Sequence, residues 1–154
     1  MDLIKKNIEK GRSVYFDNGH YVKSWTSRTP AWIKEHVELL NKMVPDFIID
    51  HGDNWIRYCS IEGKLANTFE HTDEFIRKIY NFCLESIKQT HPYVHGDWVL
   101  SNIIVKDDGS FVLIDWDNLG IYPEDEYMSK LHRDLISAFG EDKFKGIIND
   151  TASV

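Results

Sequence analysis

Two short apolar runs joined by a turn constrain the fold of this chain most. Residues 102–105 (Asn-Ile-Ile-Val) and 111–114 (Phe-Val-Leu-Ile) are rich in the β-branched and aromatic residues that strands favour. Between them, residues 106–110 carry Asp-Gly, a hairpin turn signal. The pattern predicts an antiparallel pair, which brings Asn102 beside Asp115 although thirteen positions separate them.

Polar side chains gather at the open end of this predicted hairpin. An amide (Asn102) and carboxylates (Asp115 and Asp117) would face one small volume, with Asp97 a few residues upstream. Hard oxygen ligands without thiols suit Mg²⁺, and a further carboxylate near such a metal would orient a hydroxyl nucleophile. The plainer interpretation is a solvated hairpin with acidic ends.

The spacing of these residues resembles a known family. His95-Gly96-Asp97, four residues, Asn102 and then Ile114-Asp115-Trp116-Asp117 are similar to the catalytic segment of kinase-like phosphotransferases of the aminoglycoside phosphotransferase and choline kinase type. That branch carries H-G-D-x-x-x-x-N and I-D-[WF]-[DE] where protein kinases carry H-R-D-x-x-x-x-N and D-F-G.

The resemblance implies a role for each of these residues. Asp97 would accept or orient the acceptor hydroxyl, and His95 would be a hydrogen-bonding residue of the catalytic loop. Asn102 and Asp115 would hold Mg²⁺ against the β- and γ-phosphates of ATP, with Asp117 at a second ion or in the outer shell.

The N-terminal half supplies candidates for nucleotide binding, again through the resemblance. Residues 13–16 and 20–25 flank Asp17-Asn18-Gly19, a hairpin signal, and Lys23 of the second strand would reach the ATP phosphates. Glu35 or Glu38 of the following helix would pair with Lys23, and Glu35 is preferred because Trp32 and Leu39 bracket it. Either glutamate would otherwise be ordinary surface charge. Backbone groups of the hinge-like segment at Cys59, Ser60 and Ile61 would meet the adenine edge.

The remaining elements follow from caps and periodicity. Helices are predicted from Thr29-Pro30 to about Met43, from Thr72 to about Thr90, over 124–139 and over 142–148, with 149–154 as a tail. Residues 1–12 carry no clear pattern, and a first H-G-D at 51–53 is predicted to be a turn between strands.

These elements are those of an α+β protein, and the resemblance implies the specific fold. We expect an α+β, protein-kinase-like two-lobe fold in one minimal domain. Residues 1–60 would form a small antiparallel-sheet N-lobe, and residues 61–154 a shortened, mainly helical C-lobe. Because the resembling enzymes are longer, the resemblance leaves open whether a second subunit or a protein partner completes the shortened lobe.

Composition bounds the functions that remain. No apolar run of the 154 residues reaches membrane-span length, the N-terminus lacks a signal-peptide core, and Cys59 and Cys83 are too few for a disulfide framework, which predicts a cytoplasmic protein. A net charge of −7 argues against general nucleic-acid binding.

The resemblance therefore implies an ATP- and Mg²⁺-dependent kinase acting on a hydroxyl. Protein Ser/Thr kinases usually place a lysine two residues after the aspartate, where Val99 stands here, so a small-molecule acceptor is preferred. The alternative is a minimal nucleotide-binding pseudokinase or ATPase module that regulates a partner protein. Residues 95–105 are indeed also similar to the small atypical kinase of the tRNA threonylcarbamoyl-adenosine complex, which works as an ATPase beside protein partners.

Overall fold

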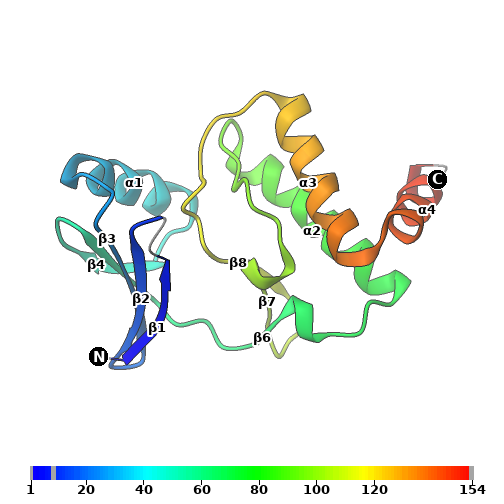
Figure 1. The fold of residues 1–154 in the computed structure, drawn as a ribbon. Coiled ribbons are helices and arrows are strands. Elements are labelled where there is room, and N and C mark those ends of the chain that lie inside the picture. The colour runs from blue at the N-terminus through cyan, green and yellow to red at the C-terminus, as the bar shows by residue number, and fades with distance from the viewer. Residues whose placement is uncertain (1, 8–9, 153–154) are drawn as a thin grey trace. The chain divides into compact units, whose positions relative to one another are not determined.

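The computed structural model describes residues 2–7 and 10–152, and it divides the chain into two compact units, Met1–Ile61 and Glu62–Val154. Each unit has its own sheet and at least one helix (Figure 1). That the two units make up a single kinase-like domain stays a prediction. No helix within the described residues is long and apolar enough to cross a membrane.

The first unit is an antiparallel sheet with one helix. Its five strands lie in the order β1-β2-β3-β5-β4, and the helix α1 packs against β4 and β5. The elements are β1 Asp2–Asn7, β2 Arg12–Asp17, β3 His20–Trp25, α1 Pro30–Met43, β4 Ile48–His51 and β5 Trp55–Tyr58.

Local sequence signals explain most of this unit. Asn18 and Gly19 both have positive φ (50° and 81°), as the two central residues of a type I′ hairpin turn require. The Thr29 side chain accepts a hydrogen bond from Trp32 N at 3.1 Å and caps α1, whose first residue is Pro30. The predicted helix and the predicted hairpins are therefore confirmed, whereas β1 was not expected from residues 1–12.

The second unit is mainly helical with a small sheet. Its strands lie in the order β6-β7-β8 and are antiparallel. The elements are β6 Lys64–Leu65, the 3-10 helix η1 Ala66–Thr68, α2 Asp73–Thr90, the 3-10 helix η2 Leu100–Asn102, β7 Ile103–Val105, β8 Phe111–Leu113, α3 Glu124–Phe139 and α4 Glu141–Ala152.

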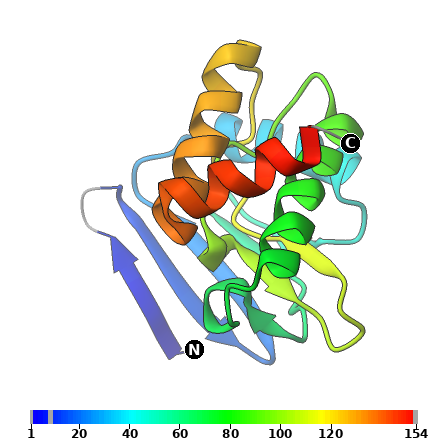
Figure 2. The same ribbon diagram turned by 90° about the vertical axis from the view of Figure 1, so that its right-hand side faces the viewer.

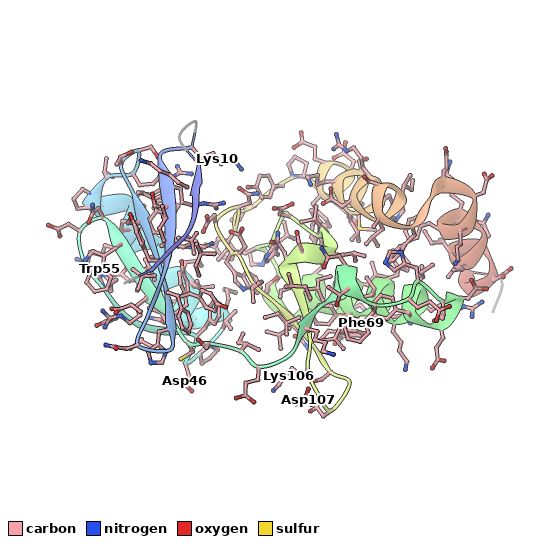
Figure 3. All side chains as sticks on the ribbon, turned by 60° about the horizontal axis from the view of Figure 1, so that its bottom comes forward. Lys10, Asp46, Trp55, Phe69, Lys106 and Asp107 are labelled. Atoms are coloured by element: carbon pink, nitrogen blue, oxygen red, sulfur yellow. The ribbon has the colours of Figure 1, made fainter. Side chains whose placement is uncertain are left out.

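The predicted hairpin forms the middle of this unit. Lys106 and Asp107 lie at its tip (Figure 3), and Gly109 takes a φ of 84° in the turn. Each strand is one residue shorter than predicted, because Asn102 ends η2 and Ile114 lies beyond β8. Even so, Ile114 N donates to Asn102 O at 2.8 Å, so the two chain segments stay paired to that point.

Three helices enclose the core of the second unit. Fully buried apolar side chains from α2, α3 and α4 meet there, namely Ile76, Ile79, Cys83, Leu131, Leu135 and Phe144. Figure 2 shows α3 and α4 joined at a sharp bend, where Gly140 ends α3 with a φ of 92°. The last helix is longer than predicted and runs to Ala152; residues 153–154 of the predicted tail lie outside the described residues.

Candidate active site

The hairpin end positions the second predicted ligand segment. Ile103 pairs with Leu113, and the bond from Ile114 N to Asn102 O leaves Asp115 as the first residue past the paired strands. Asp115 has a φ of 60°, a left-handed conformation that is uncommon outside glycine and that clusters at functional sites. Trp116 is 5% exposed, and its Nε1 donates to Leu113 O at 3.1 Å, which anchors the turn.

His95 ties the loop to the end of β8. Its Nε2 lies 2.8 Å from Ile114 O, and Asp97 N donates to its Nδ1 at 3.1 Å. Because a carbonyl only accepts, the proton is on Nε2, and Nδ1 accepts as a neutral imidazole. The ring is 1% exposed and packs edge-on against Trp116, with 4.6 Å between centroids. Both ring nitrogens are therefore hydrogen-bonded to backbone atoms, which is typical of a structural residue in a loop.

Asn102 is buried and points its amide at Asp97. Its Nδ2 donates to Asp97 O at 3.1 Å and to Asp97 Oδ2 at 3.0 Å. An amide nitrogen has two hydrogens, so these two bonds use both and leave Oδ1 as the atom that can ligate a cation. The amide orientation thus fits the predicted magnesium ligand.

The donor set around Asn102 suits Mg²⁺ in kind. Asp115 and Asp117 are half-buried carboxylates in the segment that follows β8. Within the described residues, no group of three or more His, Cys, Asp or Glu side chains gathers to hold a metal ion. One amide and two carboxylates are nevertheless what a magnesium ion takes when waters and substrate phosphates complete its shell. The joint site at Asn102, Asp115 and Asp117 stays a prediction.

Two residues that sequence reasoning missed hold the loop from α3. Trp98 N donates to Asp134 Oδ2 at 3.1 Å, and Lys130 Nζ lies 2.6 Å from each Asp134 oxygen. The same ammonium lies 3.5 Å from Asp97 Oδ1. Asp134 stands between two core positions, Leu131 and Leu135, and its side chain is only 9% exposed. An acid on the apolar stripe of a helix was the one signal in the sequence that pointed to this contact.

The thiol next to this cluster is unreactive. Burial raises the pKa of Cys83 well above its usual range, and the negative charge of Asp134 raises it further. A thiol that stays protonated is neither a nucleophile nor a metal ligand. Cys83 therefore fills space in the core.

A cavity of about 530 Å³ opens beside the loop, within the second unit. One wall is the loop itself and the other is the first half of α3 with the segment before it. The lining residues are Gly96, Trp98, Asn118, Tyr122, Asp125, Glu126, Tyr127, Ser129, Lys130 and Arg133. This cavity has the size of a small-molecule site.

The predicted nucleotide residues lie in the first unit. Lys23 pairs with Val14 and Ile56 in the sheet, and its Nζ lies 5.7 Å from the centre of the Tyr58 ring. Glu35 and Glu38 both lie on the exposed side of α1. The pairing of Lys23 with Glu35 stays a prediction.

The hinge-like residues Cys59, Ser60 and Ile61 are the last residues of the first unit. Cys59 N donates to Phe47 O at 2.8 Å, so this backbone donor is engaged within the unit. The Cys59 Sγ donates to Asp46 O, and the Ser60 hydroxyl donates to Gly19 O. The adenine contact proposed for Cys59, Ser60 and Ile61 therefore stays a prediction that rests on the remaining backbone groups.

Comparison with known proteins gives the fold. No family model matches the chain. It is 26% identical over an alignment of 113 residues to the RIO-type serine/threonine-protein kinase Rio2 of Methanocaldococcus jannaschii. The match covers 66% of this chain and 41% of that protein. Two solved structures of WbdD, a bifunctional kinase-methyltransferase, superpose on this chain at 16% sequence identity. One has a TM-score of 0.62 and covers 86% of this chain and 36% of its own. The other has a TM-score of 0.54 and covers 84% of this chain and 35% of its own.

The fold is protein-kinase-like. The predicted α+β fold class, with a small antiparallel sheet in the first unit and a mainly helical second unit, is thereby confirmed. The comparisons do not single out the aminoglycoside phosphotransferase or choline kinase branch. The chain spans about two fifths of the length of the curated relative that it matches.

Proposed function

We propose that this chain is an ATP- and Mg²⁺-dependent phosphotransferase that moves the γ-phosphate to a hydroxyl group. The observation that carries the proposal is the Asp97 carboxylate, which is held on one oxygen by Asn102 and faces Lys130 with the other. A carboxylate fixed in this way, beside an amide oxygen left over for a cation, suits the positioning work that phosphoryl transfer requires.

Each residue then has a task in the reaction. Asp97 orients the acceptor hydroxyl and takes its proton as the hydroxyl oxygen attacks the γ-phosphorus. The bond from that phosphorus to the β–γ bridging oxygen breaks, which yields ADP and the phosphorylated acceptor. His95 keeps the loop fixed against Ile114, and Asn102 keeps the Asp97 carboxylate in its orientation.

The remaining predicted residues would bind the metal and the nucleotide. Asn102, Asp115 and Asp117 would hold Mg²⁺, which when bound neutralises charge on the phosphates. Lys23, with Glu35, would bind the α- and β-phosphates, and Cys59, Ser60 and Ile61 would supply backbone contacts to adenine. These assignments come from the resemblance of the sequence to kinase-like enzymes.

For the acceptor we propose a small molecule of the kind that aminoglycoside, choline or sugar kinases use. The cavity beside the loop supports this, because tyrosine rings and the carboxylates of Asp125 and Glu126 line a space of suitable size. Rio2 is by its name a serine/threonine-protein kinase, so a protein hydroxyl is the competing acceptor. The alternative of a nucleotide-binding pseudokinase or ATPase module that regulates a partner uses the same site without transfer to a hydroxyl.

Ligand-dependent melting tests the proposal. Mg·ATP should raise the melting temperature of the full chain, because a ligand of the folded state stabilises it by mass action. Asp115→Ala should remove the part of the shift that depends on Mg²⁺, whereas Asp107→Ala, at the exposed hairpin tip, should leave it unchanged. An unchanged melting temperature at millimolar ATP would count against the enzyme and the nucleotide-binding module together.

A panel of acceptors separates the remaining alternatives. Radiolabelled γ-phosphate should appear on an alcohol, sugar or aminoglycoside and not on protein serine or threonine. Bound Mg·ATP without transfer to any hydroxyl would favour the regulatory module instead.

A further inference from the structure

The ammonium group of Lys130 occupies the space between the loop and α3. Its nitrogen lies 2.6 Å from each oxygen of Asp134 and 3.5 Å from Asp97 Oδ1. The Lys130 side chain is 36% exposed and lines the cavity beside Gly96 and Trp98. The charge is therefore fixed by one acid whose side chain is only 9% exposed, while it remains open to whatever occupies the space in front of Asp97.

Phosphoryl transfer needs a positive charge at this place. Negative charge on the transferring phosphoryl group and on the aspartate would otherwise repel each other, and fixed cations lower that cost. The loop supplies none of its own, since Trp98, Val99, Leu100 and Ser101 are uncharged. The structure brings Lys130 to the aspartate from a helix more than thirty residues later in the chain.

We propose that Lys130 is a catalytic residue that binds the transferring γ-phosphoryl group while it faces Asp97. This inference rests on the proposed phosphotransferase function and deepens it. In the reaction Lys130 keeps its proton, and its ammonium hydrogen-bonds a non-bridging γ-oxygen as the bond to the bridging oxygen breaks. Asp134 acts as a positioning residue, because it fixes both Lys130 and Trp98 N.

The proposal also removes an argument about the acceptor. The absence of a lysine at position 99 favours a small-molecule acceptor only if no other lysine serves the aspartate. With Lys130 in that role, the missing loop lysine no longer distinguishes small-molecule from protein hydroxyls. The acceptor class then depends on the cavity and on the acceptor panel alone.

Substitution of Lys130 in the full chain tests the proposal. Lys130→Met removes the charge at similar length, and Lys130→Arg keeps it. The matched control is Lys145→Met on α4, because Lys145 and Glu141 form a 2.6 Å pair at the same i,i+4 spacing on the exposed surface. The probes are the dissociation constants of Mg·ATP and Mg·ADP and the rate of γ-phosphate release to water.

Lys130→Met should lower the release rate at saturating ATP by about 100-fold, the usual loss when one preorganised charge-stabilising group is removed. Mg·ATP should bind more weakly, whereas the affinity for Mg·ADP should stay within about twofold, because ADP lacks the γ-phosphate. Lys130→Arg should recover most of the rate, and Lys145→Met should match the native chain.

The other outcomes are equally decisive. Equal weakening of ATP and ADP with a lower melting temperature would reduce Lys130 to a counter-ion of Asp134 and overturn the proposal. A native preference for ATP over ADP in Lys130→Met would overturn it while leaving the phosphotransferase function standing. If the native chain binds nucleotide without releasing phosphate, the proposal is tested by the ratio of the ATP and ADP affinities of Lys130→Met alone. A native chain that binds neither nucleotide would refute the function and this inference together.

Discussion

The same tripeptide, His-Gly-Asp, occurs once in each unit of the chain and does different work in the two places. At the turn between β4 and β5, His51 and Asp53 are exposed, and the His51 ring lies 3.4 Å from the adjoining Gly52 O. In the second unit His95 is 1% exposed, and its ring bonds Asp97 N and Ile114 O.

What surrounds each tripeptide accounts for the difference. Five residues after Asp97 stands Asn102, whose amide holds the Asp97 carboxylate, whereas five residues after Asp53 stands Tyr58, inside β5. The absence of that asparagine already predicts that the first H-G-D is a turn, and the structure confirms the turn. The tripeptide alone does not distinguish the two places. The spacing to Asn102 and the packing of the buried His95 ring against Trp116 do.

The largest effect should come from the aspartate of the second tripeptide, Asp97. If Asp97 is the proposed acceptor of the hydroxyl proton, Asp97→Ala should lower phosphoryl transfer by about 10²- to 10⁴-fold. Nucleotide affinity should remain near native, as measured by calorimetry. Asp53→Ala should leave both quantities unchanged. Equal losses of affinity and turnover in Asp97→Ala would contradict the role assigned to this carboxylate, and a loss in Asp53→Ala would break the comparison.

The two histidines should differ in stability. His95→Ala removes two hydrogen bonds to backbone and leaves a void beside Trp116, so it should lower the free energy of unfolding by about 2–4 kcal/mol. His51→Ala, at an exposed turn, should change it by less than about 0.5 kcal/mol. Denaturant unfolding measures both values. Similar small losses at the two positions would mean that the His95 bonds do not hold the loop.

Local signals in the sequence predict most of the fold. Thr29-Pro30 and Thr72 each cap a helix, and Asn18-Gly19 turns a hairpin, because these residues act on their immediate neighbours. The strand β1 escaped prediction because it is an edge strand that pairs only with β2, and its mixture of charged and apolar residues is typical of sheet edges.

The sequence motif predicts only part of the candidate site, namely the residues of the loop. His95, Asp97 and Asn102 lie within eight residues, so their spacing is readable, and their mutual hydrogen bonds follow. Lys130 and Asp134 meet the loop through packing of α3, and no local pattern links positions more than thirty residues apart. For the same reason the cavity could not be predicted from the sequence, because residues of the loop and of α3 line it together.

The smallest predicted effect concerns a third histidine, His132, and the dependence of stability on pH. His132 is half-buried on α3, its Nε2 lies 3.3 Å from the Tyr80 hydroxyl, and burial lowers its pKa below the ordinary 6.5. The unfolded chain therefore binds a proton first as the pH falls, so stability is full above about pH 6.5 and is lost as the pH drops toward the folded pKa. His132→Gln should show a smaller fall in melting temperature than the native chain between about pH 7.5 and pH 5.5. The change should be modest because solvent still reaches the ring, and an unaltered slope in His132→Gln would show that burial of this histidine does not govern acid stability.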